Sequence, residues 1–144
     1  MLIKKIKLPK VKKVEDYFMF ANGTLTSLDL PLLKNVGSTF LAYNNTLTAI
    51  SLPSLEIVES QFLTHNENVL CVNMPRLRKV GNFFLSGSVL DVKILNFPHL
   101  KEVGYNFLIN TNIAALNTLK IISPRLRSDD PNLIHWILLR HVAL

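Results

Sequence analysis

Prolines recur at a nearly constant spacing along this chain of 144 residues. Pro9, Pro31, Pro53, Pro75, Pro98 and Pro124 are separated by intervals of 22, 22, 22, 23 and 26 residues. The same apolar pattern follows most of them, with an aliphatic residue two positions later, a valine five positions later and a phenylalanine nine positions later. These three registers hold Val11, Leu33, Leu55, Leu77 and Leu100; Val14, Val36, Val58, Val80 and Val103; and Phe18, Phe40, Phe62, Phe84 and Phe107. A pattern that repeats every twenty to fifty residues or so indicates a solenoid, in which each coil buries its apolar edge only against its neighbours.

A short alternating segment precedes each proline. In the second coil, Leu28 and Leu30 alternate with Ser27 and Asp29. This period of two predicts a strand with its leucines inward and its polar side chains outward. Because proline has no amide to donate to a ladder, it is best tolerated at a strand end. We therefore expect one parallel sheet of such strands, with each coil returning through its valine and phenylalanine positions on the opposite side.

Two further registers have structural interpretations. The five phenylalanines are expected to form a ladder in the core. Asn22, Asn44 and Asn66 share one register, and we expect their side chains to bond turn backbone in the adjacent coil, because a buried amide needs partners.

The segment from Leu30 to Asn44 resembles the leucine-rich repeat superfamily, and within it the BspA-like or Treponema-type family. That family's unit reads approximately Leu-x-x-Ile-x-Leu-Pro-x-x-Leu-x-x-Ile-Gly-x-x-Ala-Phe-x-x-Cys, with cysteine where this chain has Asn22, Asn44 and Asn66. The resemblance extends over residues 3 to about 127. It implies an α/β-type repeat solenoid that is right-handed, carries its parallel sheet on the concave face, and recognises other proteins.

The two ends of the array lead to separate expectations. Residues 1–127 are expected to form a solenoid of five to six coils, and residues 128–144 a C-terminal capping helix. Ser128, Asp129, Asp130 and Pro131 supply an N-cap, acidic first-turn residues and a first-position proline. The alternatives for this apolar helix are a partner-binding or dimerising segment and a membrane-surface anchor.

The first coil begins near Met1 without a visible cap. Lys4, Lys5 and Lys7 are interpreted as charges that protect the open edge. The alternatives are a homo-oligomer formed through this uncapped coil and a truncated piece of a longer repeat array.

Composition favours one cytoplasmic domain. Hydrophobic residues make up 49% of the chain, which is ample for a packed core. No apolar run is long enough to span a bilayer, and the N-terminal segment lacks the uninterrupted apolar stretch of a signal peptide. Cys71 is the single cysteine, so no internal disulfide can form, which agrees with a reducing compartment.

The sequence predicts a protein that is not an enzyme and that carries no metal or cofactor. Its four histidines, at positions 65, 99, 135 and 141, form no ligand motif. Cys71 is expected on an outward strand position and His65 in the preceding turn, without a third group to orient them. Catalytic groups are therefore not assembled by the repeat.

Partner binding is assigned to the outward residues of the strands. The candidate concave-face residues are Ser27, Asp29, Ala49, Ser51, Cys71, Asn73, Asn96, Thr118 and Lys120. Six strands give a face of about 500 Å², smaller than the roughly 800 Å² that each partner buries in a standard interface. The sequence thus favours a non-catalytic module that binds a protein or peptide.

The alternative is polyanion or nucleic-acid binding through a basic stripe. Positions one, three and four after the prolines hold ten of the sixteen basic residues: Lys10, Lys12, Lys13, Lys34, Arg76, Arg78, Lys79, Lys101, Arg125 and Arg127. Stacked coils would bring these side chains into a row, interrupted near Glu56. A structural interpretation competes with this one, namely a solvated turn whose lysines prevent aggregation.

Overall fold

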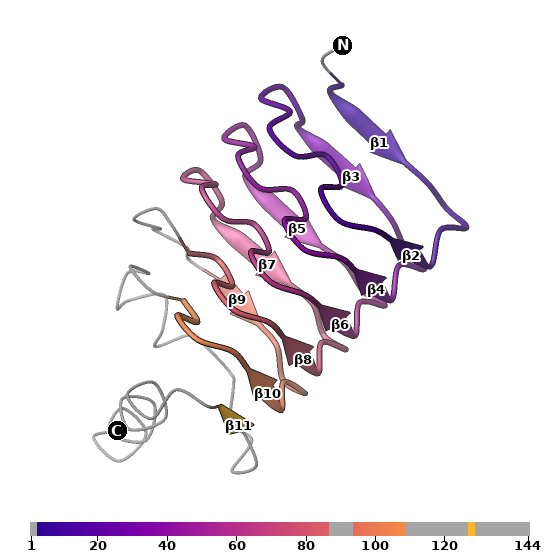
Figure 1. Ribbon diagram of the computed structural model, residues 1–144. Coiled ribbons are helices and arrows are strands. Elements are labelled where there is room, and N and C mark those ends of the chain that lie inside the picture. Colours follow the sequence, from indigo (N-terminus) through magenta and orange to yellow (C-terminus); the bar gives the residue numbers. More distant parts are fainter. Residues whose placement is uncertain (1–2, 87–93, 109–126, 129–144) are drawn as a thin grey trace.

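The structure is a computed structural model that describes residues 3–86, 94–108 and 127–128. The chain winds into a parallel β-solenoid with two short strands in each coil (Figure 1). The first strands are β1 (Lys5–Lys7), β3 (Ser27–Asp29), β5 (Ala49–Ser51), β7 (Cys71–Asn73) and β9 (Ile94–Asn96). The second strands are β2 (Lys13–Val14), β4 (Asn35–Val36), β6 (Ile57–Val58), β8 (Lys79–Val80), β10 (Glu102–Val103) and β11 (Arg127–Ser128). From β1 to β9 the chain completes about four turns, and the repeat solenoid predicted from the prolines is confirmed.

The first strands lie where the alternating pattern predicts them. Ala49, Cys71 and Ile94 stand side by side in β5, β7 and β9, and Lys5 stands beside Ser27 in β1 and β3. Their central residues point into the core, while the flanking residues point out. The hydrogen-bonded ladder is in two parts, β1-β3 and β5-β7-β9. No ladder bond joins β3 to β5 in the described coils.

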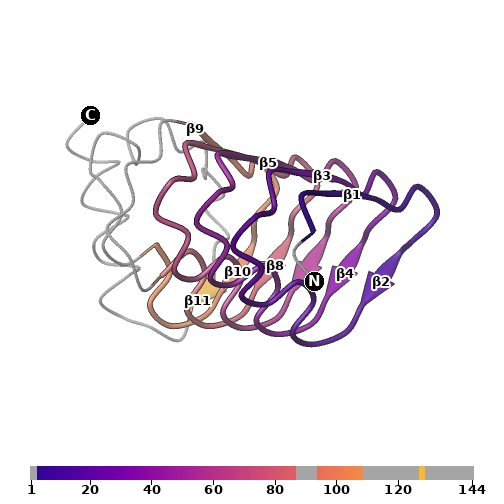
Figure 2. The ribbon, with the colours of Figure 1, turned by 90° about the horizontal axis from the view of Figure 1, so that it is seen from above.

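A second parallel sheet was not predicted. Its strand order is β11-β10-β8-β6-β4-β2, and it contains the valine register that was interpreted as a plain return of the chain. Val14 pairs with Val36 of the next coil, and Val36 pairs with Val58 of the coil after that. All three valines are buried against the core. These strands have only two residues, too few to show an alternating pattern in the sequence. Figure 2 shows the strands of both sheets stacked coil upon coil.

After its second strand, each coil continues through a segment in which every other residue has a left-handed backbone. Among the described residues, thirteen other than glycine have positive φ, including Thr39, Leu41 and Tyr43 in the second coil. Their amides bond neighbouring coils in alternating directions. The amides of Thr39 and Tyr43 donate to the next coil, and that of Leu41 donates to Phe18 O in the preceding one, at 2.9, 3.0 and 3.0 Å respectively. These inter-coil bonds hold the third side of the solenoid together.

The phenylalanine register forms a continuous stack through the core, as predicted. Ring centroids of Phe40 and Phe62 are 5.3 Å apart, and those of Phe62 and Phe84 are 5.2 Å apart, with nearly parallel planes. Phe18 and Phe107 extend the stack at its two ends. Phe40, Phe62 and Phe84 are fully buried. Stacked aromatic rings bury large apolar areas, so this ladder links each coil to the next.

Buried asparagines link coils through their side chains, which confirms the prediction for this register. The Asn44 amide donates to Met19 O of the preceding coil at 2.7 Å and to two carbonyls of its own turn. Asn66 repeats the arrangement by donating to Leu41 O and Thr64 O. Both side chains are fully buried, and these bonds satisfy their Nδ2 donors, whereas Asn44 Oδ1 and Asn66 Oδ1 have no hydrogen-bond partner among the described residues.

The helix predicted over residues 128–144 lies outside the described residues, apart from Ser128. Ser128 pairs with Val103 in the β10–β11 ladder, so the second sheet reaches that residue. The described coils consist of strands and turns, without any helix. No helix among these residues is therefore long and apolar enough to cross a membrane.

Candidate interaction surfaces

The outward residues of the first strands form one surface, here called the strand face. Ser27, Asp29, Ala49 and Ser51 are exposed, whereas Cys71, Asn73 and Asn96 are half-buried. Lys5, Lys7 and Ile94 complete the face, while Thr118 and Lys120 lie outside the described residues. The side-chain amide of Asn96 donates through Nδ2 to Asn73 Oδ1 on the neighbouring strand, at 2.7 Å. The face therefore carries mixed side chains, most of them small, that stand in register within each of the two ladders, β1-β3 and β5-β7-β9.

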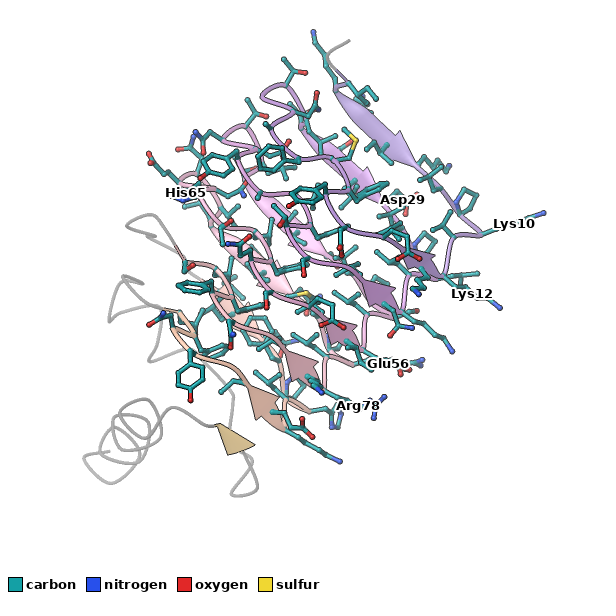
Figure 3. The ribbon with its side chains drawn as sticks, viewed as in Figure 1. Lys10, Lys12, Asp29, Glu56, His65 and Arg78 are labelled. Atoms are coloured by element: carbon teal, nitrogen blue, oxygen red, sulfur yellow. The ribbon has the colours of Figure 1, made fainter. Side chains whose placement is uncertain are left out.

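The basic stripe is also assembled. Its described members, Lys10, Lys12, Lys13, Lys34, Arg76, Arg78, Lys79 and Lys101, are all exposed. Figure 3 shows Lys10, Lys12, Glu56 and Arg78 along one edge of the coils, with His65 on the opposite side. Arg125 lies outside the described residues, and Arg127 is described only as part of β11.

Two features differ from the predicted stripe. Lys13 and Lys79 belong to β2 and β8, so they lie in the second sheet rather than in a turn beside the first. Carboxylates also neutralise part of the stripe. Arg78 pairs with Glu56 at 3.1 Å, Lys13 with Glu15 at 3.4 Å and Lys79 with Glu102 at 3.7 Å. All these pairs are at least partly exposed, so each contributes little to stability.

A third surface, here called the aromatic groove, was missed by the sequence interpretation. It is an open groove of about 600 Å³ on the side of the solenoid that the positive-φ segments form. Its lining residues are Tyr17, Phe20, Thr39, Tyr43, Gln61, Thr64, His65, Phe83, Ser86 and Asn106. The Tyr43 ring stacks on His65 at 4.4 Å and meets Phe20 edge-on at 5.5 Å. Five different coils thus contribute to one groove.

The backbone explains why the groove was missed. Tyr17, Gln61 and Phe83 occupy one register and Tyr43 and His65 another, and all five have positive φ. Residues two apart would share one face of a regular strand, yet Gln61 is exposed while Leu63, which also has positive φ, is fully buried. The only sequence signal was the presence of aromatic residues outside the phenylalanine register.

The structure separates Cys71 from His65. Cys71 lies in β7 on the strand face, whereas His65 stacks against Tyr43 in the aromatic groove. Among the residues that the structure describes, no three His, Cys, Asp or Glu side chains are grouped as metal ligands. The three surfaces therefore offer shape, charge and hydrogen bonding for recognition.

Comparison of the chain with protein-family models, with curated proteins and with solved structures found no match.

Proposed function

We propose that this chain is a non-catalytic recognition module of the leucine-rich repeat type that acts in the cytoplasm and binds a protein or peptide through its strand face. In this proposal the solenoid is right-handed and the strand face is concave. The resemblance of the Leu30 to Asn44 segment to BspA-like repeats supports the family assignment. The parallel solenoid agrees with it at the level of architecture.

The observation that carries the proposal is the ordered array of outward side chains on two parallel ladders, β1-β3 and β5-β7-β9. Parallel strands hold equal registers about 4.8 Å apart, so Ser51, Asn73 and Asn96 occupy fixed positions in adjacent rows. A surface that is already ordered loses little conformational entropy on binding. Small hydroxyl and amide groups on such a surface can bond the backbone of a partner. The modest area favours a peptide or a weakly docked domain.

Arginine substitutions on the strand face test the proposal. Ser27→Arg, Ser51→Arg and Asn73→Arg, made together, place three long charged side chains over neighbouring strands. We expect partner affinity to fall by about tenfold or more. Asn45→Arg is the control, because Asn45 lies on an exposed turn. Unchanged affinity in the triple variant, with its circular dichroism intact, would move recognition away from the strand face.

The second candidate function is polyanion binding through the basic stripe. The observation that favours it is the position of Lys10 and Lys12 at the exposed edge, where no described carboxylate lies within ion-pair distance of either. Binding to phosphates would release counterions, so affinity for RNA or heparin should fall steeply between low and physiological salt. The combined variant Lys10→Glu and Lys12→Glu should weaken such binding, and adding Arg76→Glu, Arg78→Glu and Lys79→Glu should abolish it. A salt-independent affinity would exclude this function.

A further inference from the structure

We propose that the aromatic groove binds a proline-rich peptide in the polyproline II conformation, with basic residues at the ends of the peptide. This groove is separate from the strand face, so the inference goes beyond the function proposed above and does not depend on it. Four properties of the groove lead to this ligand: its shape, its hydrogen-bonding groups, its length and the charge around it.

The shape is that of a shallow channel with aromatic walls. Thr39, Thr64 and Ser86 are buried small residues that line it. Tyr17 and Phe83 remain 65% and 41% exposed although both are large. Because these rings lose little entropy when they contact a ligand, they are suited to packing against proline rings.

Hydrogen-bond donors are available in the groove. The Thr39 hydroxyl donates to Gln61 Oε1 at 3.1 Å, which orients the amide and leaves its Nε2 group as a donor. The Tyr43 hydroxyl forms no hydrogen bond within the described residues. Polyproline II peptides have no internal hydrogen bonds, and proline residues offer carbonyl acceptors without amide donors. Donors in an aromatic channel therefore match this backbone.

The length of the groove matches the polyproline II repeat. Equal registers of adjacent coils are about 4.8 Å apart, so two coils span about 9.6 Å. One turn of polyproline II has three residues and rises about 9.3 Å. The groove extends from Tyr17 in the first coil to Asn106 in the fifth. About six peptide residues would cover that distance, with successive turns meeting alternate coils.

The charge around the groove favours a cationic or neutral ligand. No Lys, Arg, Asp or Glu is among the lining residues. No Lys or Arg lies within two positions of a lining residue in the sequence. The exposed residues Asp16, Glu59 and Glu67 each do, and so does Glu15, which is paired with Lys13. A polyanion would be repelled here, whereas basic residues at the ends of a peptide would be attracted.

Binding of a synthetic peptide to the full chain tests this proposal. The probe is a fluorescent peptide of about six prolines flanked by arginines, titrated with the protein and followed by anisotropy. Tyr43→Ala and Gln61→Ala should each weaken binding by about tenfold. Tyr105→Ala is the matched control, because Tyr105 is 48% exposed yet does not line the groove. Its affinity should equal that of the unmodified chain.

Further probes separate this proposal from other ligands. A peptide with glycine and serine in place of the prolines should bind much more weakly, and so should one with glutamates in place of the arginines. The Ser27→Arg, Ser51→Arg and Asn73→Arg variant should keep full affinity for the probe. Amide chemical shifts of the unmodified chain should change at Thr39, Gln61 and Thr64, which gives a readout independent of variant folding. The proposal would be overturned by no binding, by equal binding to Tyr43→Ala and Tyr105→Ala, or by a preference for oligoadenylate or a neutral oligosaccharide.

Discussion

At the scale of single residues, the most unusual feature is left-handed backbone at residues other than glycine. Tyr17, Met19 and Ala21 adopt it in the first coil, with φ of 62°, 53° and 53°. The conformation costs an L-residue about 1–2 kcal/mol, because the side chain crowds the following carbonyl. Each inter-coil hydrogen bond contributes only about 1 kcal/mol to the free energy of unfolding. Packing of the stacked phenylalanines must therefore contribute to holding these segments.

Ala21 allows a direct test of that cost. Ala21→Gly should raise the free energy of unfolding by about 1 kcal/mol, because glycine adopts positive φ without strain and the bond from the residue 21 amide to Ala42 O is kept. Ala49→Gly makes the same chemical change in a strand. That variant should instead lose about 0.5–1 kcal/mol. Urea denaturation of both variants measures the difference in sign, and two losses of equal size would contradict the left-handed assignment.

Gly37 fixes how closely two coils approach. A Cβ atom at Gly37 would lie 2.6 Å from the Asp16 amide nitrogen and from the Glu15 carbonyl carbon. Gly37→Ala should therefore destabilise the chain by about 1–3 kcal/mol through overpacking against backbone. A Cβ atom at Gly23 would have nothing within 4 Å, so Gly23→Ala is the matched control. The midpoint of thermal unfolding should be lower for Gly37→Ala than for Gly23→Ala. Equal midpoints would show that the two coils can move apart without loss of stability.

At the scale of elements, the first strands were predictable and the second strands were not. Leu28 between Ser27 and Asp29 shows the alternation of a half-buried strand, and β3 occupies those residues. Val36 has only Asn35 beside it in β4, so no alternation can develop. The left-handed segments were hidden for another reason. Tyr, Met and Leu do not favour positive φ, and only contacts between coils impose that conformation on them.

The interruption between β3 and β5 predicts local differences in hydrogen exchange. The amides of Leu52 and Leu70 donate to Asn73 O and Thr48 O, at 3.0 and 2.7 Å. Among the described residues, the equivalent amides of Leu30 and Thr48 form no such bond. We expect Leu30 and Thr48 to exchange faster than Leu52 and Leu70, because hydrogen-bonded core amides open least often. Exchange measured by NMR would contradict the interruption if all four amides were equally protected.

At the scale of the whole molecule, charge and aromatic residues separate to different sides of the coils. Lys10, Lys12 and Arg78 lie at the proline-turn edge, and His65 lies on the opposite side (Figure 3). The basic stripe could be predicted because its positions are tied to the prolines. The aromatic groove could not, since Phe20, Tyr43 and Phe83 occupy different registers and become neighbours only through left-handed backbone. The outward positions of Ser27, Ser51 and Asn73 were predicted from the alternating pattern, but the interruption of the ladder between β3 and β5 was not.

Affinity capture from source lysate tests whether the strand face recognises a protein partner. The first bait is the unmodified chain. The second, the strand-face variant, combines Ser27→Arg, Ser51→Arg and Asn73→Arg. The third, the charge-reversed bait, combines Arg76→Glu, Arg78→Glu and Lys79→Glu. Each is run with and without nuclease, and captured proteins are identified by mass spectrometry. We expect a discrete protein that survives nuclease, remains on the charge-reversed bait and is lost from the strand-face variant. Capture that persists on the strand-face variant but disappears after charge reversal or nuclease treatment would contradict this expectation and assign the function to the basic stripe.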